Sequence, residues 1–501
     1  MKSVSPLENA ISKFKRLLLR YALPISSCLI FGLLAYLFVF TNKLLNLDEI
    51  AGLFRKGESI SSGRWALWLS SFIFPDVSMP WINGMLSLAM LSAASCLVIA
   101  LFEIRTGLMQ ILLSGLMIVF PSQIITFSYM FTCAPYALAL LCSVLSVYVF
   151  IRGGKWRWLC SALLMALSLG IYQAYISVAA SLYLVYIIKI ILDAEAEEKL
   201  ILRRGLECIA SLIFALAAYY IINILFMRIS GTEYNNYADA SMNKDIGSLL
   251  HGLRVAYTAF LGYFYRGYYH LAATEFSRIV HIICALIVGA ELILYLVRSA
   301  SRGRRWLLVL CLALLPLAIN CLYVVSSLRH SLMLYSFTAV YVLAALCAEK
   351  LMSGRRIILR DGLALCMALI LACNLVYANR LYLKMKLEYE NAYSFYLGLV
   401  SRVKSTEGYD GDDMVVITGD AHNLIHESEI DTSDIVGIME GLINVYSRPD
   451  FITYYIGFEP PPTDWDEWSL SGGNELIEAM PEYPYEGSVV KNGDFIIVKL
   501  G

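Results

Sequence analysis

The stretch RWLCSALLMALSLGIYQAYISVAASLYLVYIIKIIL, residues 157–192, decides how the rest of this sequence is interpreted. It is too long for one helix across a bilayer, which needs about 20 mainly apolar residues. Three residues interrupt the apolar run near its middle: Gly170, Tyr172 and Gln173. We therefore expect two short spanning helices, 157–171 and 175–192, with a break between them. A single overlong helix would instead place everything that follows on the opposite side of the membrane.

Nine further apolar runs bring the expected number of spanning helices to about eleven. They are 21–41, 81–102, 107–121, 134–151, 205–227, 278–297, 306–324, 332–349 and 361–379. No small-residue cleavage site follows 21–41, so we expect a retained helix there. The composition agrees with a membrane protein, because 59% of the residues are apolar and 16% are charged, whereas soluble domains carry about 25% charged residues.

Clusters of lysine and arginine predict the orientation, because they prefer the cytoplasmic side of short loops. They are Lys13, Lys15, Arg16 and Arg20; Arg105; Arg152, Lys155 and Arg157; Lys199, Arg203 and Arg204; Arg298, Arg302, Arg304 and Arg305; and Arg355, Arg356 and Arg360. With eleven spans, all of these clusters fall on one side, which supports the break at 170–175. We expect a multi-pass protein of the plasma membrane with a cytoplasmic N-terminus and an extracytoplasmic C-terminus.

The uneven distribution of charge predicts two domains. Residues 1–400 contain 34 Lys and Arg against 20 Asp and Glu, whereas residues 401–501 contain 5 against 20. We expect an all-α transmembrane domain over 1–380 and a small extracytoplasmic α/β domain over 381–501. The main outer loops of the first domain are 42–80 and 228–277.

The C-terminal domain is expected to begin with a helix at 380–404 and to continue with short strands. Three β-type runs are separated by glycine and proline turn signals: Met414–Thr418, Phe451–Ile456 and Phe495–Leu500.

The outer loops of the membrane domain are expected to contain interfacial helices. Apolar residues recur at helical spacing in 48–74, on both sides of Gly57–Gly63, and again in 245–270. Tryptophan prefers the headgroup level of a membrane. We interpret 48–74 as two short amphipathic helices and 245–270 as one more.

No pattern supports a metal site or a nucleic-acid interface. The 12 cysteines lie singly between Cys28 and Cys373 without a C-x-x-C pair, which indicates apolar packing residues. His422 and His426 are four residues apart but lack a clear third ligand. The basic residues form short clusters between apolar runs, so we expect no nucleic acid. We expect no cofactor, and a divalent metal stays open.

The first outer loop begins with two carboxylates, Asp48 and Glu49. Acidic residues at a membrane surface are costly to desolvate, so such a pair usually has a partner or a chemical role. One carboxylate could accept the proton of a hydroxyl nucleophile. The alternative is structural, because Asp48 precedes an amphipathic helix and could cap it. The two roles are compatible, since one residue can cap while the other reacts.

Arginines in outer loops run against the positive-inside trend, so each one requires an explanation. Arginine binds phosphate oxygens in a bidentate manner, which makes a lipid-linked phosphate a natural ligand; unspecific headgroup contact is the alternative. The candidates are Arg64, Arg254, Arg266 and Arg329, and His330 beside the last of them. His330 is either part of that site or a solvated loop histidine.

Tyr172 and Gln173 lie at the outer end of a predicted helix. They could form hydrogen bonds to a sugar, or they could belong to an aromatic belt and a turn.

Four segments together resemble the Gtr type II glucosyltransferases, a family of polytopic membrane proteins grouped with the GT-C superfamily. They are LNLDEIAGLFRKGESISSGRWALWL (45–69), LSLGIYQAYISV (167–178), RLYLKMKLEYENAYSFYLGLVSRVKS (380–405) and PEYPYEGSVVKNGDFIIVKL (481–500). The resemblance implies a GT-C-like fold and transfer of glucose or a similar hexose from a polyprenyl-phosphate donor to a surface glycan acceptor. In the GT-C pattern an acidic residue of the first outer loop is the catalytic base, and Asp48 and Glu49 occupy that position.

The family pattern does not specify which residues bind the phosphate of the donor. That Arg64 and Arg329 bind it is our inference from their positions. No D-x-D motif of the kind that binds nucleotide sugars lies on a predicted cytoplasmic face, which favours a lipid-linked donor.

Two other functions agree with many spans. A transporter or flippase of a lipid-linked glycan usually contains two related halves with paired broken helices, and the sequence has no convincing halves. A non-catalytic assembly or sensor protein would use the C-terminal domain to bind a partner.

Overall fold

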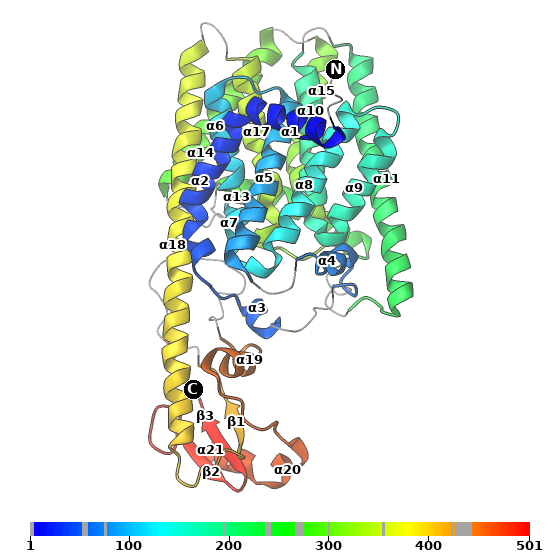
Figure 1. Ribbon diagram of the computed structural model, residues 1–501. Coiled ribbons are helices and arrows are strands. Elements are labelled where there is room, and N and C mark those ends of the chain that lie inside the picture. The colour runs from blue at the N-terminus through cyan, green and yellow to red at the C-terminus, as the bar shows by residue number, and fades with distance from the viewer. Residues whose placement is uncertain are drawn as a thin grey trace. The chain divides into compact units, whose positions relative to one another are not determined.

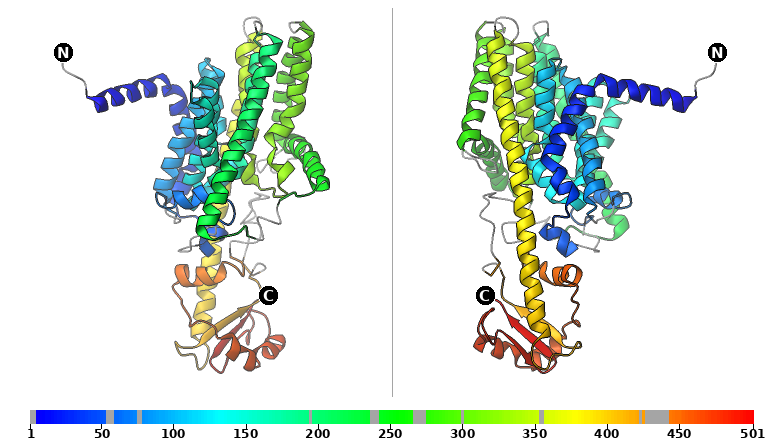
Figure 2. Two further views of the ribbon diagram at one scale, coloured as in Figure 1. Left: turned by 90° about the vertical axis from the view of Figure 1, so that its right-hand side faces the viewer. Right: turned by 60° about the vertical axis from the view of Figure 1, so that its left-hand side comes forward.

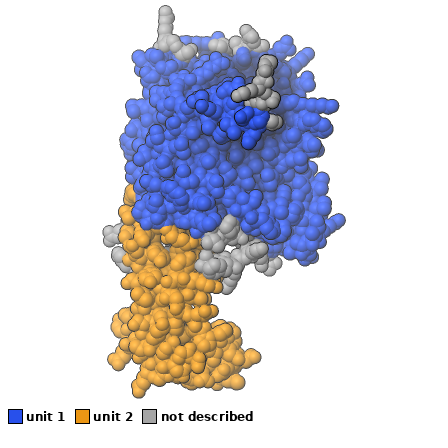
Figure 3. Space-filling view, in the orientation of Figure 1, with its two compact units in different colours: residues 1–42, 56–379 blue, residues 43–55, 380–501 orange. Residues whose placement is uncertain are grey.

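The computed structural model describes residues 5–501 except 53–58, 75–77, 194–195, 236–241, 266–274, 299–300, 353–355, 422–423 and 426–442. The chain forms two compact units (Figure 3). Unit 1 comprises Met1–Asn42 and Lys56–Asn379, and unit 2 comprises Lys43–Arg55 and Arg380–Gly501. Residues 43–55, which contain the acidic pair, therefore belong to the same unit as the C-terminal region.

Unit 1 is helical, and its long helices run side by side as a bundle (Figures 1 and 2). Its elements are α1 (Pro6–Arg20), α2 (Ala22–Thr41), α4 (Trp65–Ser70), α5 (Pro80–Phe102), α6 (Gly107–Ile118), α7 (Pro121–Ser128), α8 (Met130–Arg152), α9 (Arg157–Ile171), η1 (Gln173–Tyr175), α10 (Ile176–Ile191), α11 (Glu198–Ser230), α13 (Ile246–Tyr265), α14 (Glu275–Arg298), α15 (Arg302–Ile319), α16 (Leu322–Val325), η2 (Ser331–Phe337), α17 (Thr338–Lys350) and the first part of α18 (Ile357–Lys404).

Eight helices in the described part of the chain are long and apolar enough to cross a membrane, or nine if the bent pair α6–α7 is one span. They are α2, α5, α8, η1–α10, α11, α14, η2–α17 and α18. The chain is therefore an integral membrane protein. The predicted number of eleven is not reached on length and composition, because α9 has only 15 residues and α15 begins with Arg302, Arg304 and Arg305.

The predicted break in the stretch 157–192 is confirmed. Helix α9 ends at Ile171, Tyr172 has extended backbone angles (φ −149°, ψ 107°), and α10 begins at Ile176. The hydroxyl of Ser143 donates a hydrogen bond of 2.9 Å to the backbone carbonyl of Tyr175. A side chain of α8 thus satisfies a polar group of the broken backbone, as an interrupted helix inside a membrane requires.

A second interruption separates α6 from α7, whose axes differ by 41°. Two carbonyl groups at the end of α6 accept hydrogen bonds from tyrosine hydroxyls: Tyr335 donates to Met117 at 2.9 Å, and Tyr36 donates to Ile118 at 2.6 Å. Pro121, the first residue of α7, has no N–H to continue the α6 ladder.

Unit 2 contains a three-stranded sheet with the order β1 (Met414–Thr418), β3 (Phe495–Lys499), β2 (Val489–Asn492). Strand β3 is parallel to β1, with Val416 opposite Ile497, and antiparallel to β2. Its helical elements are α3 (Leu47–Gly52), the end of α18, α19 (Arg448–Phe451), a π-helical turn η4 (Ile452–Ile456), α20 (Trp465–Leu470) and α21 (Gly473–Ala479).

Both faces of the central strand β3 are buried. Ile496 and Val498 belong to a cluster with residues of α18 and α19, whereas Phe495 and Ile497 pack with Trp468 of α20. This alternation is the period of two that a strand imposes on its side chains.

Two of the three predicted strands are confirmed, β1 and β3, and the prediction of a strand at 451–456 is wrong. The segment is helical, and Phe451, Ile452 and Tyr455 all pack into the same cluster. Tyr455 follows Phe451 by four residues and Ile452 by three, which is the spacing of a helix face, while the β-branched and aromatic composition of the segment resembles a strand. The predicted helix at 380–404 is the end of α18, a single helix of 48 residues.

Candidate active site

A tight turn over Ser59–Trp65 packs against the break between α9 and α10. The amide of Arg64 donates to the carbonyl of Ser59 at 2.7 Å, and Gly63 has a positive φ of 76°. A Cβ atom at Gly63 would lie 2.8 Å from the hydroxyl of Tyr219 and 3.2 Å from Nε2 of Gln173. Glycine is thus required here both by conformation and by space.

Arg64 caps α4 and places its guanidinium beside two stacked tyrosines. The rings of Tyr136 and Tyr172 lie 4.5 Å apart at an angle of 17°. Nη1 of Arg64 donates a long hydrogen bond of 3.4 Å to the hydroxyl of Tyr136, and Cζ lies 6.0 Å from the ring centre of Tyr172. The ring of Tyr172 and the hydroxyl of Tyr136 thus both contact the cation.

Gln173 fixes the turn. Its Nε2 donates to the carbonyl of Ser62 at 3.1 Å and to the hydroxyl of Tyr219 at 3.4 Å, and Tyr219 donates in turn to the carbonyl of Gly63 at 3.0 Å. The broken helix, the turn and α11 are thereby joined through side chains.

Trp65, the residue after Arg64, is also closely packed. Trp65 stacks on Phe226 of α11 at 5.1 Å. A Cβ atom at Gly170 would lie 2.5 Å from the ring of Trp65. Gly170 therefore permits α4 to lie directly on α9, which keeps Arg64 at the end of that helix.

A second basic group lies around α13. Nη2 of Arg329 lies 3.4 Å from Nε2 of His251. Arg254 is exposed on α13, three residues after His251, and His330 is half-buried just before η2. Arg266, the remaining predicted arginine, lies outside the described residues.

The acidic pair lies in the first turn of α3, in unit 2. Asn46 caps this helix: its Oδ1 accepts from the amide of Asp48 at 2.9 Å, and its carbonyl accepts from the amide of Ile50 at 3.1 Å. The interpretation of Asp48 as the cap is therefore wrong. The apolar Leu47 already begins the helix, so the cap falls two residues before Asp48.

The two carboxylates have different surroundings. The side chain of Asp48 is exposed, whereas Glu49 is 1% exposed. Nζ of Lys43 lies 2.5 Å from Oε1 of Glu49. Oε2 of Glu49 has no hydrogen-bond partner among the residues that the structure describes. Glu49 is thus an internal anchor of α3, and Asp48 is the exposed member of the pair.

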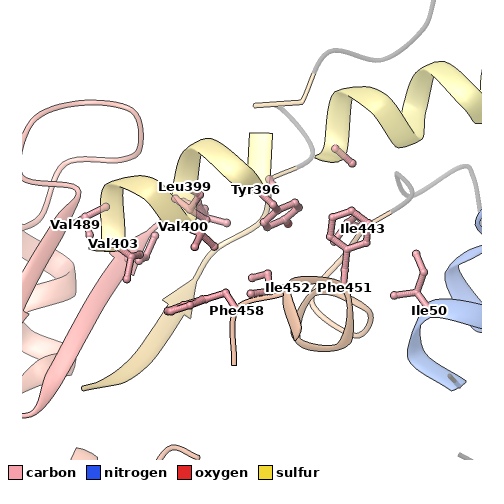
Figure 4. Close-up of a cluster of buried hydrophobic side chains, with 14 of the residues drawn as sticks. Ile50, Tyr396, Leu399, Val400, Val403, Ile443, Phe451, Ile452, Phe458 and Val489 are labelled. Atoms are coloured by element: carbon pink, nitrogen blue, oxygen red, sulfur yellow. The ribbon is translucent and has the colours of Figure 1, made fainter. Parts of the chain in front are cut away.

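Helix α3 is attached to the core of unit 2. Leu45 and Ile50 are fully buried in a cluster with Tyr396 and Phe451, part of which is drawn in Figure 4. Tyr455 stacks on Phe451 at 5.4 Å. Burial and, second, the charge of Glu49 raise the pKa of Tyr455. The C-terminal region therefore fixes the position of the acidic helix.

The structure thus distributes the predicted site residues over three places. Arg64, Tyr172 and Gln173 meet at the helix break; Arg254, Arg329 and His330 lie on α13 and before η2; Asp48 and Glu49 lie on α3 of unit 2. Among the described residues, no group of three or more His, Cys, Asp or Glu could hold a metal ion. His422 and His426 lie outside them.

Several residues of these sites were not indicated by the sequence. They are Tyr136 and Tyr219 beside Arg64, His251 beside Arg329, and Lys43 and Asn46 beside the acidic pair. Only Asn46 carried a local signal, as an asparagine directly before a helix.

Comparison with known proteins identifies one family. A family described as Glucosyl transferase GtrII matches residues 37–348, more than half of the chain. The match includes α3, the turn at Arg64 and the break at Tyr172. No curated protein sequence matches the chain.

Proposed function

Since the chain belongs to the Glucosyl transferase GtrII family and is a membrane glucosyltransferase, we propose that it transfers glucose or a similar hexose from a polyprenyl-phosphate donor to an extracytoplasmic glycan. A donor with a long apolar tail explains why the enzyme is embedded in a bilayer. The single observation that carries the proposal is the position of the Arg64 guanidinium, between the hydroxyl of Tyr136 and the ring of Tyr172 at the end of a broken membrane helix.

In this proposal the membrane domain has eleven spans and a GT-C-like arrangement. The count is reached when α9, α15 and the bent pair α6–α7 each cross the membrane. The lysine and arginine clusters of the short loops then share the cytoplasmic side. The N-terminus is cytoplasmic, the C-terminal domain over 381–501 is extracytoplasmic, and the membrane is the plasma membrane.

Arg64 is proposed to bind the phosphate of the donor. A guanidinium forms bidentate hydrogen bonds with phosphate oxygens, and its stabilisation of negative charge increases as the sugar–phosphate bond breaks. Gln173 and Tyr172 hold the arginine and its turn in place. Arg254, Arg266, Arg329 and His330 are proposed as further contacts with the donor.

Asp48 is proposed as the catalytic base, because it is the exposed member of the pair. A hydroxyl of the acceptor attacks the anomeric carbon, and its proton passes to the carboxylate. The bond between that carbon and the phosphate oxygen breaks, and its electron pair leaves with the polyprenyl phosphate. Direct displacement of this kind inverts the configuration at the sugar. Glu49 holds α3 through Lys43.

One structural feature favours the alternative of a transporter or flippase. Transporters use interrupted helices, and two interruptions occur here, at α6–α7 and at α9–α10. Membership of a glucosyltransferase family supports sugar transfer over transport.

The test uses purified protein in liposomes with labelled polyprenyl-phosphate glucose and isolated surface glycans. We expect label in the glycan, with a new glycosidic linkage. Label that crosses the membrane with its original linkage would instead establish transport. Arg64→Gln should lower transfer at least about a hundredfold, because removing one stabilising group of this kind costs ~10²–10³ in rate. Arg228→Gln, an exposed arginine at the end of α11, is the control.

A further inference from the structure

Helix α1 forms from its own local signals. The hydroxyl of Ser5 accepts from the amide of Glu8 at 3.1 Å, and the carboxylate of Glu8 accepts from the amide of Ser5 at 2.9 Å. This reciprocal capping box satisfies two N–H groups at the start of the helix. The helix continues to Arg20 and has a length of about 22 Å at 1.5 Å per residue.

The two faces of α1 differ in chemistry. One face is apolar and is formed by Leu7, Ile11, Phe14, Leu17 and Leu18, which are between 42% and 70% exposed. Their spacing of three and four residues places them on one side of a helix. The opposite face is basic and contains Lys13, Arg16 and Arg20, with Lys15 at its border. The one acidic residue of α1, Glu8, belongs to the capping box.

Helix α1 is joined directly to a candidate membrane span, which restricts where it can lie. Only Tyr21 separates it from α2, which is apolar and long enough to cross a membrane. The guanidinium of Arg20 lies 5.6 Å from the ring centre of Tyr21. Figure 2 shows α1 leaving the end of α2 sideways, away from the other helices of unit 1. Amphipathic helices with a basic face commonly lie in the interface plane of a membrane.

We propose that α1 is an in-plane membrane helix that binds the anionic lipids of the leaflet at the N-terminal end of α2. Its apolar face enters the boundary of the acyl chains, and its basic face contacts the headgroups. Anionic lipid is the binding partner that charge complementarity favours, because α1 has four basic side chains and a single acidic one. The exposed apolar face is then covered by lipid.

The experiment uses the full-length protein in lipid nanodiscs. Nitroxide labels are attached through Phe14→Cys on the apolar face or Ser12→Cys on the polar face, in a Cys160→Ser background that removes an exposed native thiol. Accessibility to molecular oxygen, which partitions into the bilayer, is compared with accessibility to a water-soluble nickel chelate. Discs of phosphatidylglycerol and discs of phosphatidylcholine are measured side by side.

We expect the label at residue 14 to favour oxygen and the label at residue 12 to favour nickel in phosphatidylglycerol. Neutralising Arg16 as Arg16→Gln should lower the ratio of bound to free helix about fivefold in those discs, since each basic residue near an anionic surface contributes a factor of that order. Phosphatidylcholine discs should not respond to this change. Nickel access at both positions would overturn the proposal, and so would a label at residue 14 shielded from both reagents, because the latter indicates a protein partner such as a second copy.

Discussion

Replacing Gly63 by alanine tests whether the turn at Arg64 has the described geometry. Alanine at a φ of 76° costs about 1–2 kcal/mol of backbone strain. Its Cβ would also meet the hydroxyl of Tyr219 at 2.8 Å and Nε2 of Gln173 at 3.2 Å. Relief of that contact separates Tyr219 from the carbonyl of Gly63 and Gln173 from the carbonyl of Ser62.

The chain offers a matched control in Gly231, which ends α11. Its φ is 64°, and none of the described residues has an atom within 4 Å of the place that a Cβ would occupy. The substitution Gly231→Ala therefore causes backbone strain alone. The substitution Gly63→Ala causes the same strain and also breaks two hydrogen bonds, each of which contributes about 1 kcal/mol. The difference of about 2 kcal/mol corresponds to about a 30-fold smaller population with Arg64 in place.

The assay is the rate of glucose transfer from labelled donor in liposomes, measured as kcat/KM for the donor. We expect Gly63→Ala to lose about 30-fold relative to Gly231→Ala. Adding Tyr219→Phe to Gly63→Ala removes the oxygen that the Cβ meets, so the double variant should recover part of this loss. Equal activity of the two alanine variants, in an enzyme that Arg64→Gln inactivates, would refute the geometry of the turn.

Four further predictions concern unit 2. Asp48→Asn should lower transfer at least about a hundredfold at unchanged expression, since general-base catalysis supplies ~10²–10⁴, whereas Glu49→Gln should lower the thermal stability measured by melting. Phe451→Ala should cost about 3–5 kcal/mol of unfolding free energy and also lower activity, because Phe451 packs with Leu45 of the acidic segment. Asp413→Asn should destabilise unit 2 between pH 4 and 10. The measurement is hydrogen exchange of the β1 amides, and the difference in exchange rate between the variant and the natural protein should disappear in acid.

The pH range of the last prediction follows from two shifts. Burial alone raises the pKa of Asp413, but hydrogen bonds from Lys491 and from the amide of Asp410 outweigh it and hold that pKa below 3.8. The hydrogen bond to Asp413 raises the pKa of Lys491 above 10.5. Stability from the lowered carboxyl is present above pH 3.8 and is lost as the pH falls through its folded pKa. Stability from the raised amine is present below pH 10.5 and is lost at higher pH.

The predictions for Asp48 and Phe451 have internal controls. Asp466 occupies the second position of α20, where its amide binds the capping side chain of Asp464 at 3.0 Å, just as the amide of Asp48 binds Asn46. Asp466→Asn should leave transfer unchanged, and an equal loss in both variants contradicts a catalytic role of Asp48. Phe495→Ala removes a phenylalanine buried against Trp468 instead. If Phe495→Ala lowers activity as much as Phe451→Ala at matched stability, then activity does not depend on the packing of α3 against Phe451.

Local signals predicted the helical elements well. The polar residues at Tyr172 and Gln173 marked the break, because an apolar run that long cannot cross a bilayer as one helix. The strand predicted at 451–456 is helical, since aromatic and β-branched side chains fit either a strand or a helix that packs on a core. The number of eleven spans stays a prediction, because length and composition give eight spans in the described residues, or nine with the bent pair α6–α7, and α9 has only 15 residues.

The site was predicted only in part, because its partners are distant in sequence. Arg64 was singled out by its position, but Tyr136 lies in an apolar run 72 residues later, where nothing distinguishes it from its neighbours. The attachment of Ile50 to Phe451 joins opposite ends of the chain. Such contacts depend on tertiary packing, and no local pattern encodes them.

The packing of Leu45 and Ile50 against residues near the C-terminus has a consequence for biosynthesis. At synthesis rates of about 5–20 residues per second, the roughly 400 residues between Ile50 and Phe451 take about 20–80 s to make. During that interval the acidic segment exists without the core that receives it. A chain that stopped before Phe451 would contain every candidate membrane helix of the described residues and would leave Leu45 and Ile50 without the side chains that bury them.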